Sequence, residues 1–423
     1  MENFEKVLLV GVYTADQSYE DFTYELDELE NLCEACQMTA VDRIVQNLDY
    51  VNNVSYVGKG KLSEIRYYLD NNEVDGVVFN DELTPAQVSN IQDALDVQIY
   101  DRTYIILEIF SRRAKTKEAK LQVDIASLRY MLPRLAGLHK GMSRQRGAGG
   151  GFAHGRGAGE TKLELERRAT TDRIVSLKKE LADFTKLRKQ QRVLRKKNDV
   201  KTVSLVGYTN SGKSTTLNTL LAHSKGIKKE VFQKDMLFAT LETSTRMIET
   251  TNSKFLLTDT VGFVSKLPHL LVEAFKSTLE EIKESDLIVH IVDCSNPNFF
   301  KQITVTNEVL KEIGVVDIPI IYAFNKIDKV VGYFYIPQEY EKVIKISAKN
   351  SQGIDELLKA IEEVIFSDYV YLELVIPYEK QPIIYTELAN GIDTSVYYEQ
   401  DYILWEGKLP QHIANKIDPN LKK

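Results

Sequence analysis

A glycine-rich segment that ends in a lysine and a serine carries the residues best suited to chemistry in this chain. Residues 207–214 read Gly-Tyr-Thr-Asn-Ser-Gly-Lys-Ser and follow the apolar run 203–206. Glycines let the backbone curl, so that N–H groups and the start of the next helix point at phosphate oxygens. Lys213 could reach the β and γ phosphates, and Ser214 could offer its hydroxyl to Mg²⁺. The segment predicts a nucleotide-binding P-loop formed by Gly207, Tyr208, Thr209, Asn210, Ser211, Gly212, Lys213, Ser214 and Thr215.

A second segment supplies a carboxylate and another glycine. Asp259 and Gly262 stand in the order Asp-Thr-Val-Gly at the end of the apolar run 255–257. At such a position a carboxylate can hold Mg²⁺ through water, and a glycine N–H can sense the γ phosphate. We therefore expect Ser214 and Asp259 to serve the metal, while Lys213 and Gly262 serve the phosphate that is transferred.

Two further segments indicate which base is bound. Asn325-Lys326-Ile-Asp328 follows an apolar run, and so does Ser347-Ala348-Lys349. The Asp328 carboxylate can accept two hydrogen bonds from guanine N1–H and N–H₂, a pair of donors that adenine lacks. Asn325 can brace the loop, Lys326 can lie along the ring, and a backbone N–H of residues 347–349 could read guanine O6. Four motifs in the order found in Ras-like GTPases predict GTP and GDP as the ligands.

The composition is typical of a multidomain protein of the cytoplasm. The chain has 423 residues, a net charge of −7 and 43% hydrophobic residues, which allows about two to four domains. It contains no run of eighteen apolar residues, and acidic residues precede its first apolar run, so we expect neither a membrane span nor a secretory signal. Cys33 and Cys36 form one C-x-x-C without a second pair; apolar packing is the better interpretation, with a zinc or redox site as the alternative.

Charge is concentrated in one segment. Residues 112–201 contain 25 Lys and Arg against 9 Asp and Glu, a net charge of +16 that leaves −23 on the rest of the chain. A basic segment inside an acidic protein suggests a polyanionic partner that docks there. A solvated helix face is the alternative.

The basic segment should form an antiparallel helical hairpin. Apolar residues recur every three or four positions from Ala114 to Leu135 and again from Ile174 to Phe184. The loop between them, residues 137–160, contains nine glycines and few apolar residues, so it cannot repay its ordering entropy internally. We expect its Arg144, Arg146 and Arg156 to contact structured RNA, with a plain flexible linker as the alternative.

Smaller α/β regions flank the hairpin and the nucleotide motifs. Apolar runs 7–12, 74–79 and 97–100 alternate with helical patterns, which predicts a small parallel α/β domain. Within it, residues 58–61 (Gly-Lys-Gly-Lys) could cradle an anion or simply form a tight turn. Residues 369–375 and 394–405 read as strands around a helix-like 380–390, which predicts a compact α+β domain. The predicted division is an N-terminal α/β domain (1–111), a basic hairpin (112–198), a Ras-like G domain (199–368) and a C-terminal α+β domain (369–423).

Over essentially its whole length the chain resembles the HflX family, ribosome-associated GTPases of the Obg-HflX group. The resemblance rests on the P-loop, on Leu-Phe-Ala-Thr-Leu at 237–241, on Asp-Thr-Val-Gly-Phe at 259–263 and on residues 157–164. It implies that Thr240 is the switch I threonine that coordinates Mg²⁺ in the GTP state and assists hydrolysis. It also implies that the hairpin loop enters the large ribosomal subunit near the peptidyl-transferase centre.

The residue after Gly262 bears on hydrolysis. Ras-like GTPases place a glutamine there to orient water, whereas this chain has Phe263, which has no donor or acceptor. We expect slow hydrolysis by the free protein and stimulation by the ribosome. K⁺ is a candidate second ion, because Asn210 occupies the P-loop position at which some related GTPases hold it.

Together these features predict a monomeric GTPase that binds ribosomes, separates stalled or idle ones into subunits and resets by hydrolysis. Two alternatives stay open: an NTP-driven RNA remodeller with a second nucleotide site at residues 58–61, and a GTP-dependent switch for a protein partner.

Overall fold

The computed structural model describes residues 4–135, 156–197, 199–224, 238, 244–251, 253–330, 332, 335–389 and 391–423. They form two compact units. The first contains the described residues up to Thr185 together with Phe238 and Ser265–Lys276, and the second contains the others. Within the described residues, no helix is both long and apolar enough to cross a membrane.

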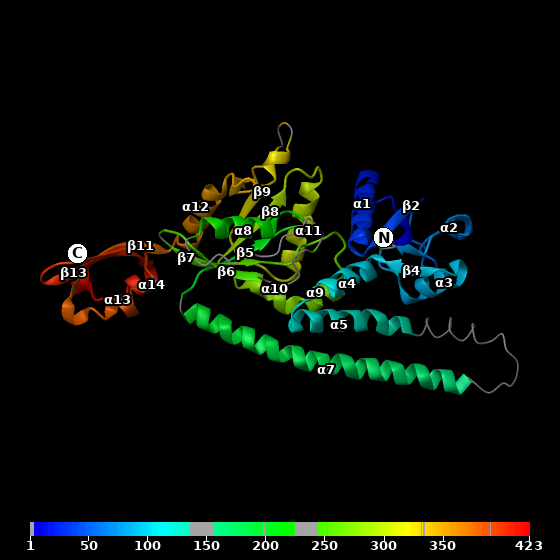
Figure 1. Cartoon of the computed structure of the whole chain (residues 1–423), viewed down its shortest axis with the longest axis horizontal. Coiled ribbons are helices and arrows are strands. Elements are labelled where there is room, and N and C mark those ends of the chain that lie inside the picture. Colours follow the sequence, from blue (N-terminus) through cyan, green and yellow to red (C-terminus); the bar gives the residue numbers. More distant parts are fainter. Residues whose placement is uncertain are drawn as a thin grey trace. The chain divides into compact units, whose positions relative to one another are not determined.

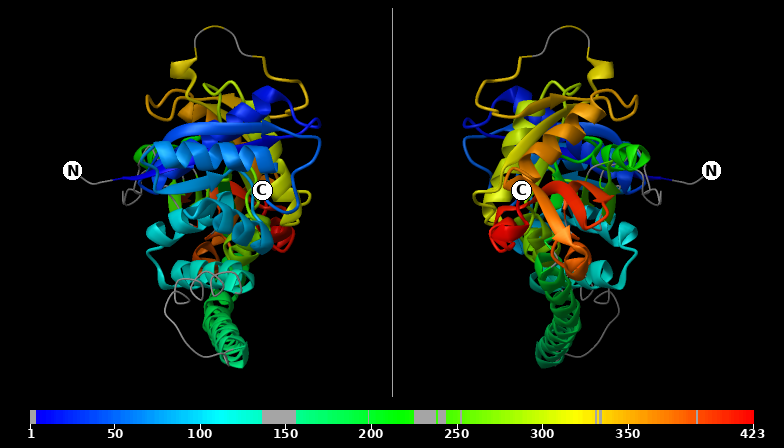
Figure 2. Two further views of the ribbon diagram at one scale, coloured as in Figure 1. Left: turned by 90° about the vertical axis from the view of Figure 1, so that its right-hand side faces the viewer. Right: turned by 90° about the vertical axis from the view of Figure 1, so that its left-hand side faces the viewer.

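The first unit begins with a four-stranded parallel sheet in the order β2-β1-β3-β4. Alternate residues of the strands face α2 and α3 on one side and α1 and α4 on the other, and the left view of Figure 2 looks onto the side that α2 and α3 cover. Gly11 allows α1 to pack closely, because a Cβ there would lie 2.7 Å from Phe22 Cζ. The elements are β1 (Glu5–Tyr13), α1 (Tyr19–Ala35), β2 (Met38–Asn47), α2 (Lys59–Asn71), β3 (Gly76–Phe79), α3 (Pro85–Leu95), β4 (Gln98–Asp101) and α4 (Arg102–Arg113).

The predicted helical pairing is present. Leu121 and Ile125 of α5 (Lys117–Met131) pack against Ile174 and Leu177 of α7 (Arg156–Lys197), and the Lys117 ammonium pairs with Glu180 across the two helices. A short 3₁₀ helix, η1 (Leu132–Arg134), follows α5. The continuous α-helical pattern expected from Ala114 onward is wrong at its start, because α4 ends at Arg113 and Thr116 caps a new helix by accepting the Ala119 N–H.

The predicted loop is shorter than expected at its C-terminal end. Residues 156–160, placed in the loop by their glycines, form the first turns of α7. Each glycine costs a helix about 1 kcal/mol, but extending a helix is far easier than nucleating one, and a long helix follows. The predicted RNA contacts Arg144 and Arg146, with the rest of 136–155, lie outside the described residues, and so does the side chain of Arg156.

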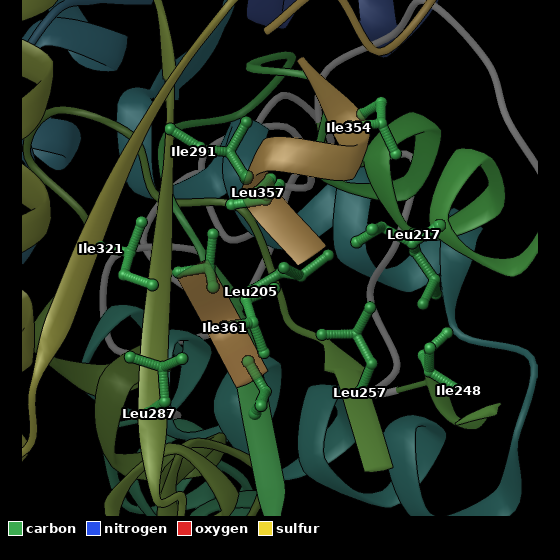
Figure 3. Packing of buried hydrophobic residues seen from close by; sticks show 14 of the residues in the cluster. Leu205, Leu217, Ile248, Leu257, Leu287, Ile291, Ile321, Ile354, Leu357 and Ile361 are labelled. Carbon is green, nitrogen blue, oxygen red and sulfur yellow. The ribbon is translucent and has the colours of Figure 1, made fainter. Parts of the chain in front are cut away.

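The second unit contains a six-stranded sheet in the order β10-β9-β8-β5-β7-β6, parallel except for β6. Leu217 of α8 and Leu357 and Ile361 of α12 pack on one face of it against Leu205 and Leu257 (Figure 3). Helix α11 packs on the other face. The elements are β5 (Thr202–Val206), α8 (Lys213–His223), β6 (Ser244–Glu249), β7 (Lys254–Asp259), α10 (Lys276–Lys283), β8 (Leu287–Asp293), α11 (Phe299–Glu312), β9 (Ile320–Asn325), η2 (Ile327–Lys329), β10 (Val343–Lys345) and α12 (Ile354–Ile365); α9 (His269–Ala274) lies in the first unit.

The C-terminal part is a three-stranded antiparallel sheet in the order β11-β13-β12, with α13 and α14 on one side (Figure 1). The single strand expected over 394–405 is wrong: the chain turns after Tyr398, and the Glu399 N–H donates to Tyr402 O at 2.9 Å. Of the helix-like 380–390, the described residues 380–389 contain one short α-helix, α13. The elements are β11 (Tyr369–Pro377), η3 (Tyr378–Lys380), α13 (Ile383–Thr386), β12 (Ile392–Tyr398), β13 (Tyr402–Pro410), α14 (Gln411–Ala414) and η4 (Pro419–Leu421). The predicted α/β class, with its parallel sheets and helical hairpin, is confirmed.

Candidate guanine-nucleotide site

Two glycines of the P-loop make close approaches that no other residue could make. Gly207 has φ 145°, and a Cβ on it would lie 2.3 Å from Ile291 O. Gly212 has φ 96°, and its Cβ would lie 2.2 Å from Asn325 Nδ2. Helix α8 begins at the next residue, Lys213, so its positive end faces this loop. The backbone is therefore shaped as an anion cradle.

Buried hydroxyls in the loop fit a polar ligand. Thr209 Oγ1 and Ser211 Oγ are buried and have no hydrogen-bond partner among the described residues. A buried polar atom without a partner costs about 1 to 3 kcal/mol, which a bound phosphate can recover. Tyr208 is buried beside them, and Thr215 lies in the first turn of α8.

Lys213 is fully enclosed. Its Nζ donates to Gly207 O at 3.0 Å and to Tyr208 O at 2.8 Å. Burial lowers the pKa of this ammonium to about 8, while the nearby Asp259 carboxylate acts in the opposite direction. A negatively charged phosphate would restore the favourable partner that the buried charge requires.

The two residues expected to serve Mg²⁺ are in contact. Ser214 Oγ donates to Asp259 Oδ2 at 2.6 Å, at the start of α8 and the end of β7. A hydroxyl and a carboxylate side by side supply the oxygen ligands that Mg²⁺ prefers, and the same ion can also bind phosphate oxygens. Thr240, the third residue expected at the metal, lies outside the described residues.

The loop after β7 bonds directly to the P-loop. Phe263 O accepts the Thr209 N–H at 2.8 Å, and the Phe263 N–H donates to Gly207 O at 3.2 Å. The phenyl ring is buried. A Cβ on Gly262 would lie 3.1 Å from Lys213 Nζ. Gly262 therefore lies beside the ammonium that is expected to reach the γ phosphate.

The base side is organised around Asn325. Its Nδ2 donates to Ser211 O at 2.8 Å, and its Oδ1 accepts the Ala348 N–H at 3.0 Å. This buried side chain thus joins the P-loop to the loop after β10, which is the bracing role expected of it. One of the backbone N–H groups of residues 347–349 was expected to read guanine O6. In this structure the Ala348 N–H donates to Asn325 and is not free for that role.

Asp328 is exposed and held in one orientation. The Ser347 hydroxyl donates to its Oδ1 at 2.6 Å, and this bond lowers the pKa of the carboxyl. The exposed group is therefore an anion, and its oxygens are the hydrogen-bond acceptors that reading guanine requires.

Lys326 is fixed by a residue that sequence reasoning missed. Its Nζ lies 2.8 Å from Asn210 O and 2.7 Å from Asp293 Oδ2. Asp293 ends β8 and also accepts the Ser295 hydroxyl and N–H. The available signal was an acid directly after a buried apolar strand, the same signal that singled out Asp259.

A second missed residue is Lys266, four positions after Gly262. It has φ 53°, a conformation that a lysine adopts only under constraint. Within the first unit its Nζ lies 2.7 Å from Glu25 Oε2 and 2.5 Å from Asp81 Oδ1. Within the first unit, Lys266 is thus held by α1 and by the segment after β3.

The other candidate sites are less well supported. The Gly58 N–H donates to Gln46 Oε1 at 2.9 Å, and Lys61 pairs with Glu64, as in an ordinary turn. Cys33 and Cys36 are buried, and burial raises the pKa of each thiol, that of Cys36 to about 12. Among the described residues there is no group of three or more His, Cys, Asp or Glu side chains placed to hold a metal. These cysteines pack as apolar side chains.

Comparisons with known proteins agree with this geometry. Family models match at residues 23–111 (GTP-binding GTPase N-terminal), 113–195 (GTP-binding GTPase Middle Region) and 202–326 (50S ribosome-binding GTPase). A solved GTP-binding protein of Sulfolobus solfataricus in complex with GDP is 25% identical to this chain, and the match covers 86% of this chain and 99% of that chain with a TM-score of 0.43.

Curated relatives cover most of the chain. GTPase HflX of Lacrimispora saccharolytica is 43% identical over 98% of this chain and 96% of the relative. GTPase HflX of Escherichia coli is 37% identical over 88% of this chain and 86% of the relative. This chain therefore belongs to the HflX family of GTPases, and it binds guanine nucleotide and hydrolyses GTP.

Proposed function

We propose that the protein binds the large ribosomal subunit and its RNA in the GTP state, separates stalled or idle ribosomes into subunits, and resets by hydrolysis. The observation that carries the proposal is the basic hairpin. Arg167, Arg168, Arg173, Lys178 and Lys179 are exposed on α7. Helical spacing places Arg168 and Lys179 opposite the Ile174 and Leu177 face that packs on α5, and the other three beside that face. The family model that matches the G domain is described as a 50S ribosome-binding GTPase. We place this activity in the cytoplasm and expect a monomer.

The residues divide the work as follows. Lys213 and the P-loop N–H groups hold the phosphates, Asp328 reads the base, and Asn325 keeps the two ends in register. Ser214 and Asp259, with Thr240, would hold Mg²⁺, which neutralises charge on the phosphates when bound. Asn210 is the candidate K⁺ ligand, and its carbonyl already accepts the Lys326 ammonium. Phe263 cannot orient water, so a group from the ribosome must complete the catalytic arrangement.

Density gradients of ribosomes test the proposal. Whole ribosomes are incubated with the protein and GTP, GDP or a nonhydrolysable GTP analogue. We expect the protein to sediment with large subunits, and free subunits to increase, with GTP and its analogue but not with GDP. If the protein binds neither ribosomes nor subunits with any nucleotide, the alternative of a switch for a protein partner is favoured.

A variant series separates the hairpin from the nucleotide site. Replacing Arg144, Arg146 and Arg156 with serine should weaken co-sedimentation and flatten its salt dependence, because each phosphate contact releases counterions. Nucleotide affinity should not change. The matched control replaces Arg43, Arg66 and Arg246, which lie outside the hairpin, and should leave ribosome binding intact. If both triple variants weakened co-sedimentation equally, the loop would make no specific RNA contact and would be a flexible linker.

The RNA remodeller needs a second nucleotide site at residues 58–61. Its Gly58 N–H is already bonded to Gln46, which favours the turn. ATP-stimulated unwinding of an RNA duplex by an Asp328→Asn protein would support the remodeller, since that activity would not depend on the guanine site.

A further inference from the structure

The outer face of the C-terminal sheet is open and unusually aromatic. Residues 369–423 contain seven of the 22 tyrosines of the chain. The inner face is covered: Ile403, Trp405 and Leu409 of β13 pack with residues from α13 and α14. Residues between these, on the opposite face of β13, are partly exposed. This face therefore has no covering element among the described residues.

Register shows which side chains share that face. Leu404 lies opposite Val375 on one side and Tyr397 on the other. One step along, Glu406 lies opposite Glu373, and the next position pairs Lys408 with Tyr371. Side chains opposite each other on one face lie within contact distance, with Cβ atoms about 5 Å apart. The face thus combines aromatic rings, two aliphatic side chains and a carboxylate pair.

The rings are exposed to solvent. Tyr371 is 55% exposed and Tyr397 50% exposed, and Tyr402 at the end of β13 is 38% exposed. A contiguous apolar and aromatic patch on a surface usually marks an interaction site. Single tyrosines scattered over a surface would need no explanation. Tyr371, Tyr397 and Tyr402 instead lie on one face of this sheet, one on each of its three strands.

The charges select the partner. Two carboxylates directly opposite each other in a sheet repel. Glu373 has Lys423, a residue at the chain end, at 3.4 Å, and in the described part of the chain no cation pairs with Glu406. Lys408 is already paired with Asp393 at 2.7 Å. Residues 369–423 contain eight acidic and five basic residues, so this region would repel the phosphates of RNA.

We propose that this face binds an arginine- or lysine-rich segment of another protein. The carboxylates of Glu373 and Glu406 would receive the cations, and the rings of Tyr371 and Tyr397 would stack on guanidinium groups or on lysine stems. The proposal is independent of the nucleotide site and adds a protein contact within residues 369–423.

The test measures anisotropy of a fluorescent peptide of alternating arginine and glycine with the full chain at physiological ionic strength. We expect binding that Glu373→Gln with Glu406→Gln weakens about tenfold. The matched control, Glu379→Gln with Glu387→Gln, changes charge equally on the same domain, away from the face, and should stay within about twofold. Equal weakening would show that bulk charge alone attracts the peptide, and no binding by the parent protein would overturn the proposal.

A second pair, Tyr371→Ser with Tyr397→Ser, keeps the charge and should also weaken peptide binding. Affinity for a single-stranded RNA should not change in this variant; a loss of RNA binding with peptide binding intact would make the face a nucleic-acid surface instead. Loss of concentration-dependent self-association in the same variant would make it a contact between copies of this chain. Thermal unfolding and GTP hydrolysis should match the parent protein in all variants.

Discussion

At the base end of the site, Asn325 joins two loops by hydrogen bonds at 2.8 and 3.0 Å, and Ser347 already orients Asp328. At the phosphate end, Lys213 bonds to carbonyls of its own loop, and Phe263 bonds to the backbone of Thr209. The first set of contacts can persist when guanine binds. The second involves groups that a triphosphate needs, so it must open.

This difference has a mechanistic consequence. A preorganised base end gives affinity for GDP and GTP alike, because little reorganisation is required on binding. At the phosphate end, the γ phosphate must compete with the carbonyl groups that now bind Lys213. A partner that opens these hydrogen bonds could therefore control the GTP state. Specificity and switching are thus assigned to opposite ends of one site.

The largest expected effect concerns hydrolysis. Because Phe263 cannot orient water, the free protein should hydrolyse GTP slowly. Large subunits should raise the single-turnover rate on the order of a thousandfold, the scale of groups supplied in trans. Rates should be measured with large subunits, small subunits and neither, in K⁺ and in Na⁺. If neither the subunits nor K⁺ raised the rate, the phosphate end would not be the point of control, and the protein-partner switch would be favoured.

A second prediction concerns Gly212, which lies where the P-loop contacts Asn325. In Gly212→Ala, the new Cβ would meet Asn325 Nδ2 at 2.2 Å in a backbone conformation that alanine avoids. We expect GDP binding to weaken about a hundredfold, equivalent to about 3 kcal/mol. Gly60→Ala is the control, since a Cβ there has nothing within 4 Å. Isothermal titration of GDP, with thermal unfolding to verify folding, measures both. Tight GDP binding by Gly212→Ala would show that the junction is not rigid.

The third prediction concerns the base. Asp328→Asn places a donor opposite guanine N1–H and leaves a polar group unpaired, at about 1 to 3 kcal/mol. GDP affinity should fall about 5- to 150-fold and xanthine nucleotides should gain. Asp355→Asn, an exposed position in the first turn of α12, is the matched control. If Asp328→Asn bound GDP as tightly as the parent protein, the base end would not be read by this loop.

The predicted strands of the nucleotide site share one property, a buried apolar strand followed by a polar motif. Strands β5, β7 and β9 all show it. β8 was missed although it is a buried central strand. Two other missed strands, β2 and β6, are edges: β2 is mostly exposed or half-exposed, and in β6 only Ile248 is buried. Strands at an edge carry polar residues and so lack the apolar run that identifies a central strand.

Charged contacts at long sequence separation were missed for another reason. Lys266 pairs with Asp81 and Glu25, and Asp293 pairs with Lys326. Spacing rules describe neighbours on one element, whereas these pairs form only when the fold brings distant segments together. The P-loop and the Asn325 and Asp328 motif could be predicted because each performs its chemistry within one short loop.

The smallest expected effect is a pH dependence confined to the phosphate end. Burial lowers the pKa of Lys213 to about 8 in the nucleotide-free protein, and adjacent phosphates should raise it. Above pH 8, nucleotide binding must therefore take up a proton, and GDP affinity should fall about fivefold between pH 8 and 9. Stability of the free protein should change in the opposite direction, because between pH 8 and 10.5 the unfolded chain binds more protons at this residue than the folded one. Calorimetry in buffers of different ionisation enthalpy counts the proton, and Lys213→Arg, which does not titrate, is the control. Proton-free binding at pH 9 by the parent protein would mean that Lys213 stays charged without nucleotide, and the contrast between the two ends would then rest on hydrogen bonds alone.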